Sequence, residues 1–252
     1  MNARLLVFTL IFVVLIGVVA YVFRGEGDPV LRPVKELRVR ITSTATVPEP
    51  TNIQSTGDWY YLYHLSSGLA HYDSAKKTFL PMLASSWSQN ADGTHIFKLR
   101  EGIKFHDGTP ITAKDVVWSI KRHLILKTST HFPLWEYLVG CDKLKTLEDD
   151  CPGLNFTANN EIVFRLKAQT DSFYLQMASP ETGIWAASDM DAATTALKPT
   201  KYSGPYFFES RTDDGALLKR NEFSMISVKF PNSPRTIRLN TTPLSSLDIA
   251  LT

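Results

Sequence analysis

The amino-acid sequence predicts an α/β fold, because a strand hairpin and a capped helix follow each other within one stretch. Apolar and charged side chains alternate over residues 95–100, which is typical of a half-buried strand. Asp92-Gly93 before this strand offers the positive φ that a short hairpin turn needs, so residues 86–88 are expected to lead into the hairpin. Thr112 and Asp115 have the spacing of a capping box, which predicts a helix running to about Leu126.

Further strands and helices are expected on both sides of this stretch. Residues 36–42 alternate aliphatic side chains with charges, as a half-buried strand does. An aromatic helix or turn is expected over residues 59–65, and a short helix over residues 173–177. A further strand of the same sheet as the hairpin is expected at residues 161–166, and a last strand at residues 235–239.

Composition places the chain among ordinary folded proteins. Its 252 residues, 44% hydrophobic and 21% charged, suffice for one large core or two modest lobes. The net charge of +2 produces no strong field, and no block of like charges is present. Nucleic acid is therefore not an expected partner.

Residues 5–23 form an unbroken apolar run behind a single arginine, Arg4. A run of this length fits a membrane-spanning helix, and it also fits the apolar centre of a cleaved signal peptide. The large side chains after Ala20 favour an uncleaved anchor in the inner (cytoplasmic) membrane, with the rest of the chain periplasmic or extracytoplasmic. We therefore divide the chain into residues 1–25 (signal peptide or anchor), 26–35 (linker) and 36–252 (folded lobe).

Cys141 and Cys151 are the only two cysteines, and in an exported chain such a close pair predicts a disulfide. His64 and His71 are too widely spaced for one helical metal-binding face, and no carboxylate or cysteine supports them. The sequence therefore predicts neither a metal site nor a cofactor.

Residues 81–122 resemble the signature of the family 5 extracellular solute-binding proteins, the dipeptide and oligopeptide receptors of bacterial ABC importers. A second landmark, Gly204-Pro205-Tyr206, is similar to a strand of that family. The residues that carry the resemblance in the first stretch are Leu83-Ala84, Trp87, Asp92-Gly93, residues 97–100, Gly102, residues 104–108, Thr112-Ala113 and residues 115–117.

The resemblance implies a periplasmic-binding-protein-like lobe of the class II type with a mixed sheet. It covers only the N-terminal half of the family architecture, so the lobe is expected to be incomplete and truncated before the second lobe. The implied function is capture of dipeptides or oligopeptides, or another small polar solute, for ABC permease subunits. The alternatives are a membrane-anchored half-lobe that acts as an interaction or scaffold protein, and a non-functional truncated receptor.

Five residues are candidates to contact the ligand. Thr44 follows the first strand, which leads into the ligand cleft in the resembled family, and Trp59 and Tyr61 offer flat amphipathic rings. Glu181 and Trp185 stand at places that lie near the cleft in relatives. Catalysis is not expected, because the chain has no nucleophile elbow, zinc-protease sequence or phosphate loop.

Overall fold

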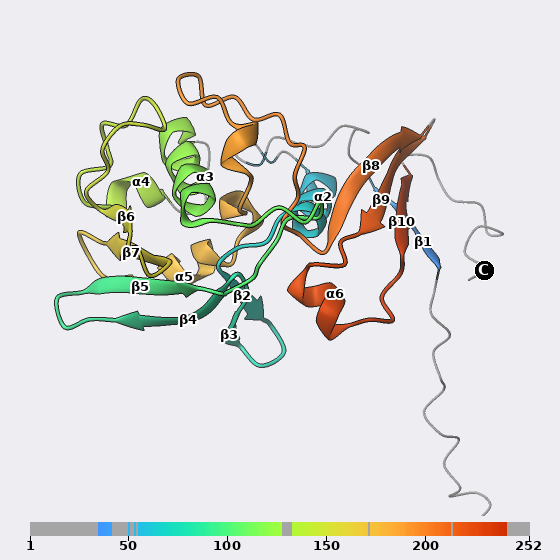
Figure 1. The fold of residues 1–252 in the computed structure, drawn as a ribbon, viewed down its shortest axis with the longest axis horizontal. Coiled ribbons are helices and arrows are strands. Elements are labelled where there is room, and N and C mark those ends of the chain that lie inside the picture. Colours follow the sequence, from blue (N-terminus) through green and yellow to red (C-terminus); the bar gives the residue numbers. More distant parts are fainter. Residues whose placement is uncertain are drawn as a thin grey trace, which may run out of the picture. The chain divides into compact units, whose positions relative to one another are not determined.

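Two four-stranded sheets carry the fold of the computed structural model (Figure 1). The model describes residues 35–41, 50, 53, 55–127, 133–170, 172–212 and 214–240. Strands are β1 (Glu36–Arg40), β2 (Ala70–Asp73), β3 (Thr78–Pro81), β4 (Ala84–Gln89), β5 (Thr94–Leu99), β6 (Leu154–Phe156), β7 (Glu161–Arg165), β8 (Tyr206–Thr212), β9 (Gly215–Arg220) and β10 (Thr236–Asn240). Helices are α2 (Thr56–Leu65), α3 (Ala113–Leu126), α4 (Leu134–Tyr137), α5 (Ser172–Met177) and α6 (Met225–Lys229), with 3₁₀ turns η1 (Pro180–Thr182) and η2 (Ala187–Asp189).

The first sheet has the order β4-β5-β7-β6 and is antiparallel throughout. Gly93 in the β4–β5 turn has a φ of +82°, the left-handed value that the Asp-Gly pair predicts. Phe97 and Leu99 on β5 are buried, while Lys98 between them is exposed. The predicted hairpin, its alternation and its pairing with the strand at residues 161–166 are all confirmed.

Helix α3 begins with the predicted capping box. The backbone N–H of Asp115 donates to the Thr112 hydroxyl at 3.4 Å, and the backbone N–H of Thr112 donates to the Asp115 carboxylate at 2.7 Å. Helix α3 contacts β6 and β7, and its apolar face lies in the first core, with Val116 and Ile120 fully buried. This first core also holds Phe97 and the rest of the β4-β5-β7-β6 sheet.

The second sheet is mixed and has the order β1-β10-β9-β8. Strands β1 and β10 are parallel, with Glu36 beside Thr236 and Arg40 beside Asn240, whereas β10-β9 and β9-β8 are antiparallel. Helix α2 covers the inner face of this sheet beside β8 and forms a second core with it (Figure 1). The expected α/β lobe with a mixed sheet is therefore confirmed.

A disulfide joins Cys141 and Cys151, as the sequence predicts. Both cysteines are buried at the edge of the first core. The loop that they close supplies the backbone oxygens of Leu147 and Asp149, which accept hydrogen bonds from the ammonium group of Lys121 on α3. The disulfide therefore holds in place a loop whose carbonyl groups accept the hydrogen bonds of the largely buried Lys121 ammonium group.

No helix in the described part of the chain is long and apolar enough to cross a membrane. The apolar run at residues 5–23 lies outside the described residues, as does all of the linker except Lys35. The division into residues 1–25, 26–35 and 36–252 therefore stays a prediction.

Candidate functional site

The carboxyl ends of β1 and β10 meet at one edge of the second sheet, because these two strands run parallel. Open α/β sheets bind ligands in the crevice outside the carboxyl ends of their parallel strands. The final register pair at this edge is Arg40 beside Asn240, and Ile41 extends β1 with a hydrogen bond from its N–H to the Asn240 carbonyl at 2.8 Å. We call this place the carboxyl edge.

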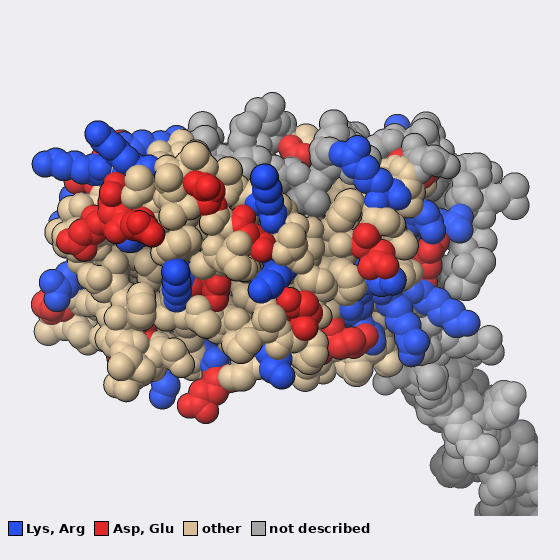
Figure 2. All heavy atoms as spheres, turned by 45° about the horizontal axis from the view of Figure 1, so that its top comes forward, with Lys and Arg blue, Asp and Glu red and all other residues tan. Residues whose placement is uncertain are grey.

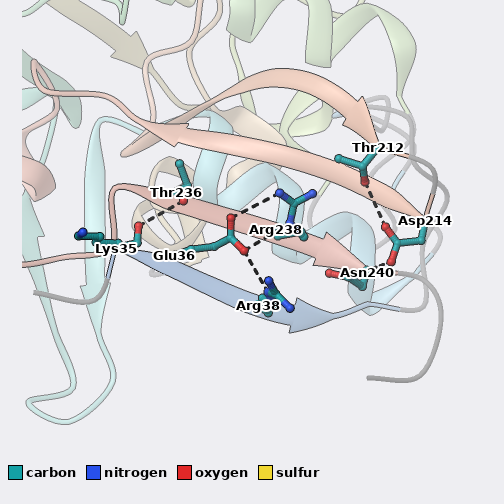
Figure 3. A network of polar contacts seen from close by, with 8 residues as sticks. All are labelled: Lys35, Glu36, Arg38, Thr212, Asp214, Thr236, Arg238 and Asn240. Carbon is teal, nitrogen blue, oxygen red and sulfur yellow. Dashed lines mark hydrogen bonds and ion pairs between the residues drawn. The ribbon is translucent and has the colours of Figure 1, made fainter. Parts of the chain in front are cut away.

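Polar side chains of three elements meet at the carboxyl edge (Figure 3). Asp214, in the turn between β8 and β9, accepts hydrogen bonds from the Thr212 hydroxyl at 3.3 Å and from the amide nitrogen of Asn240. Because the amide nitrogen faces the carboxylate, the Asn240 Oδ1 atom points elsewhere. This oxygen is buried and has no hydrogen-bond partner in the described structure, so the edge has an unused acceptor.

Tyr61 has an unused hydroxyl in the second core. Its ring is fully buried in the cluster that also holds β9 and β10 side chains, and its Oη atom finds no partner in the part of the chain described. Burial raises the pKa of Tyr61 to about 12, although the positive charge of Arg211 on β8 opposes the shift. The hydroxyl therefore stays protonated at neutral pH and remains a hydrogen-bond donor.

A second group of polar and aromatic side chains lies on the exposed side of α2. The ring centroids of Trp59 and Tyr63 are 5.9 Å apart, and Tyr63 is 56% exposed. Burial of the phenol and, to a smaller extent, the charge of Glu181 raise the pKa of Tyr63. Glu181 belongs to η1, which contacts α2, so two of the predicted ligand residues, Trp59 and Glu181, come near one another through Tyr63.

Trp185 lies in the second core, in the same cluster of buried side chains as Tyr61. It is 2% exposed, and its ring packs against Tyr202 with centroids 6.0 Å apart. The backbone N–H of Trp185 donates a hydrogen bond to the hydroxyl of Ser119 on α3 at 2.9 Å. This hydrogen bond links the second core to α3. Thr44 is outside the described residues.

Metal binding finds no support in the described residues, which contain no group of three or more His, Cys, Asp or Glu side chains able to hold an ion. His106-Asp107, a tempting acid–base pair in the sequence, forms a turn. Asp107 accepts a hydrogen bond from the backbone N–H of Thr109 at 2.9 Å, and the His106 ring packs on Phe207 with centroids 4.3 Å apart. Both residues therefore stabilise the local fold.

Comparison with protein families gives a match to the family model described as bacterial extracellular solute-binding proteins, family 5 Middle. The match covers residues 78–223, more than half of the chain. The chain belongs to family 5 of the bacterial extracellular solute-binding proteins. It is a family of solute-binding proteins, and the resemblance that the sequence suggested is confirmed.

Several curated relatives are named for peptides. The periplasmic murein peptide-binding protein MppA of Escherichia coli is 27% identical over 130 residues, which are 52% of this chain and 24% of MppA. A probable di/tripeptide-binding protein of Pseudomonas aeruginosa is 25% identical over 172 residues, which are 61% of this chain and 31% of that protein. This chain therefore spans about a quarter to a third of the length of these relatives.

Solved structures show the same fold at low sequence identity. NikA of Brucella suis, solved in complex with Fe(III)-EDTA, superposes with a TM-score of 0.68 at 20% identity, covering 83% of this chain and 40% of NikA. The unliganded open form of MppA gives a TM-score of 0.68 at 19% identity, covering 84% of this chain and 42% of that chain. The match to both is to the fold of a family 5 lobe.

Sequence reasoning missed Asn240, Asp214 and Tyr63. Asp214 stands in an Asp-Asp-Gly turn that the sequence does reveal, but the partner strand of that turn is not visible without the sheet order. Asn240 ends the last strand, and only its parallel pairing with β1 brings it to the carboxyl edge. Tyr63 lies one helical turn after Trp59, and this spacing is the sequence feature that could have placed the two rings side by side.

Proposed function

We propose that this chain is the extracytoplasmic solute-binding component of an ABC importer and that it captures short peptides at the carboxyl edge. The observation that carries the proposal is membership of family 5 together with relatives named for murein peptides and for di- and tripeptides. Capture is reversible and selects a ligand-bound conformation, without making or breaking bonds. The proposed function is therefore binding and not catalysis.

The chemistry of the carboxyl edge supports a peptide ligand. A peptide presents both N–H donors and carbonyl acceptors, and the edge offers an acceptor in Asn240 Oδ1. This atom is buried and unpartnered in the described structure, so a ligand hydrogen bond would remove a desolvation cost that the free protein carries. The Tyr61 hydroxyl is a further unpartnered donor, in the second core. Thr44, Trp59, Glu181 and Trp185 stay proposed ligand residues, with Trp59 on α2 and the buried Glu181 on η1, which contacts α2.

Isothermal titration calorimetry of the full chain with a panel of di-, tri- and oligopeptides tests the proposal. Saturable binding is expected, and the Asn240→Ala variant should bind about tenfold more weakly, because one hydrogen bond to a buried amide is lost. The matched control is Asn155→Ala, at an exposed asparagine on β6, which should bind as the unaltered protein does. A well-folded chain that binds no peptide in the panel contradicts the proposal.

We propose further that residues 1–25 direct export and that residues 5–23 hold the chain in the inner membrane, followed by a linker at residues 26–35. An unbroken apolar run of this length supports both steps. Fractionation of expressing cells and mass determination of the N-terminus test this. If the mature chain begins near residue 21 and fractionates with the periplasm, the N-terminal segment is a cleaved signal peptide and the membrane-anchor proposal is wrong.

A second candidate function, a non-catalytic scaffold lobe that binds a partner protein, has one observation in its favour. A groove of about 480 Å³ runs between the β2–β3 hairpin and α6, lined mainly by apolar side chains such as Leu80, Met82 and Phe230. Val228 and Phe230 on its rim are 65% and 54% exposed. The scaffold function requires that Val228→Ser with Phe230→Ser abolishes binding to a partner protein and that the unaltered chain binds no peptide; peptide binding would assign the groove to the receptor's own permease contact instead.

A further inference from the structure

A cavity of about 320 Å³ lies where α3, β6 and the disulfide loop, residues 142–150, meet. We call it the disulfide-loop cavity. Much of its lining is apolar, with Trp118 from α3 and with Leu154 and the 54% exposed Phe156 from β6. Ligand pockets in proteins start at about 300 Å³ and combine apolar walls with a few polar groups. The cavity therefore has room for one small molecule.

The two sides of the disulfide-loop cavity carry opposite charges. Its charged lining residues are Lys114 and Lys121 from α3 and Glu148 and Asp150 from the disulfide loop. In the part of the chain that the structure describes, no ion pair joins these lysines to these carboxylates. Figure 2 shows acidic and basic side chains next to one another at the end of the molecule that holds α4 and β6. The cavity therefore has a basic wall and an acidic wall that do not neutralise each other by direct contact.

Lys121 holds the acidic wall in place. Its ammonium group donates hydrogen bonds to the backbone oxygens of Leu147 and Asp149 at 3.1 and 2.5 Å. Burial lowers the pKa of Lys121, and the charges of Asp150 and Asp149 oppose this shift. The Asp149 carboxylate accepts hydrogen bonds from two backbone N–H groups of its own loop, at 2.7 and 2.9 Å, and only Glu148 and Asp150 among the loop acids line the cavity. Because the walls are fixed before a ligand arrives, binding costs little ordering of the protein.

Lys114 supplies a cation that a ligand can reach. Its side chain is exposed, and its ammonium nitrogen lies 4.3 Å from the centroid of the Trp118 ring. A cation–π contact at an exposed site is weak, so a carboxylate in the cavity can draw the ammonium group away from the ring at small cost. The same movement uncovers the face of the Trp118 ring, which can then pack against an apolar group of the ligand.

We propose that the disulfide-loop cavity binds a free α-amino acid with an aromatic or large aliphatic side chain. Charge complementarity supports this ligand, because an amino acid is a zwitterion with one carboxylate and one ammonium group. The carboxylate pairs with Lys114, and the ammonium group pairs with Glu148 and Asp150. The side chain packs between Trp118 and Phe156. No residue of the carboxyl edge lines this cavity, so the site is additional to the proposed peptide site and does not depend on it.

Three ligands separate the contributions of the two charges. Phenylalanine should bind with a Kd of about 1 mM, because the ligand is small and the charge pairs are exposed to solvent. N-acetyl-phenylalanine lacks the ammonium group, and phenylalaninamide lacks the carboxylate. Each of these two should bind about threefold more weakly than phenylalanine, since each loses one exposed charge pair.

Nuclear magnetic resonance of the full chain in detergent micelles, with isotope-labelled tryptophan, tests the proposal. The chain has five tryptophans, and the indole signal of Trp118 is the one that is missing from the Trp118→Phe variant. Phenylalanine should shift the Trp118 signal saturably, with a Kd of about 1 mM. The indole signal of Trp87 on β4, which does not line the cavity, should not change.

Variants of each charged wall should change the order of the three ligands. Lys114→Gln should weaken the binding of phenylalanine and N-acetyl-phenylalanine about threefold without weakening that of phenylalaninamide, which has no carboxylate to lose a partner. Glu148→Gln with Asp150→Asn should weaken the binding of phenylalanine and phenylalaninamide about threefold without weakening that of N-acetyl-phenylalanine.

Control variants change the charge equally at exposed residues that do not line the cavity: Lys143→Gln for the basic wall, and Asp142→Asn with Glu101→Gln for the acidic wall. Both should bind phenylalanine as the unaltered chain does. A Trp118 signal that phenylalanine does not shift overturns the proposal. So does an equal affinity for all three ligands in every variant, which would assign the cavity to an apolar group alone. Peptide titration of the same samples is a separate measurement, so a failure of the proposed peptide function is distinguishable from a failure of this site.

Discussion

Replacing His123 removes a buried titratable ring from α3 and should change how stability depends on pH. The ring is fully buried, and neither of its nitrogens has a hydrogen-bond partner in the described structure. Burial and, to a smaller extent, the charge of Arg122 lower the pKa of His123 to about 4. In the unfolded chain the pKa of this histidine is near 6.5. Between about pH 6.5 and 4 the unfolded state therefore binds a proton at His123 that the folded state does not bind.

The sign and size follow from this difference. Above about pH 6.5 His123 is neutral in both states and does not reduce the unfolding free energy. As the pH falls from 6.5 towards 4, protonation of His123 in the unfolded state lowers the unfolding free energy progressively. At about pH 5 the unfolded histidine is almost entirely charged and the folded one almost entirely neutral, which costs about 2 kcal/mol of unfolding free energy. At about pH 4 the loss approaches 3 kcal/mol.

Urea unfolding followed by tryptophan fluorescence, repeated between about pH 7.5 and 4, measures the effect. His123→Leu has a similar volume and no proton to bind, so its unfolding free energy should fall by about 2 kcal/mol less than that of the unaltered chain between about pH 7.5 and 5. His64 and His106, whose pKa values burial also lowers, are present in both proteins and cancel in the comparison. His123→Phe is the second variant, and parallel pH profiles for all three proteins would refute the reasoning.

Three further predictions concern the fold. Replacing Cys141 and Cys151 by Ser should lower the unfolding free energy by roughly 2–3 kcal/mol in urea titrations and abolish any effect of reductant; an unchanged free energy would contradict this. Thr112→Ala removes the α3 cap and should cost about 1 kcal/mol, and a cost near zero would mean that Asp115 suffices. Gly215→Ala places a Cβ atom against the Leu239 carbonyl oxygen, so it should lower the unfolding free energy by more than about 2 kcal/mol and weaken peptide binding as well. An unaffected melting temperature would count against the close β9–β10 approach.

Local features of the fold were predictable from the sequence because neighbouring residues determine them. The Asp92-Gly93 turn, the Thr112 capping box and the alternation on β5 each depend on contacts within a few residues. The disulfide was predictable for a similar reason, since only one pairing of two cysteines exists. These features define the first sheet and its covering helix.

The candidate site was less predictable because its geometry depends on distant pairings. Periodicity identified β1 and β10 as strands, but not that residues 36–40 and 236–240 lie side by side. The aromatic segment at α2 was recognised, yet sequence alone did not decide which ring faces the core. The structure buries Tyr61 and exposes Tyr63, because α2 packs one side against the sheet.

The β1–β10 pairing joins binding and folding in one sheet. At its amino end, the Lys35 carbonyl accepts a hydrogen bond from the Thr236 hydroxyl across 201 residues of sequence. At its carboxyl end, the same pairing brings Asn240 beside β1, so the proposed peptide site exists only when this long loop is closed. A peptide bound there would stabilise the closed sheet, and the gain in unfolding free energy would rise with the logarithm of the peptide concentration above Kd.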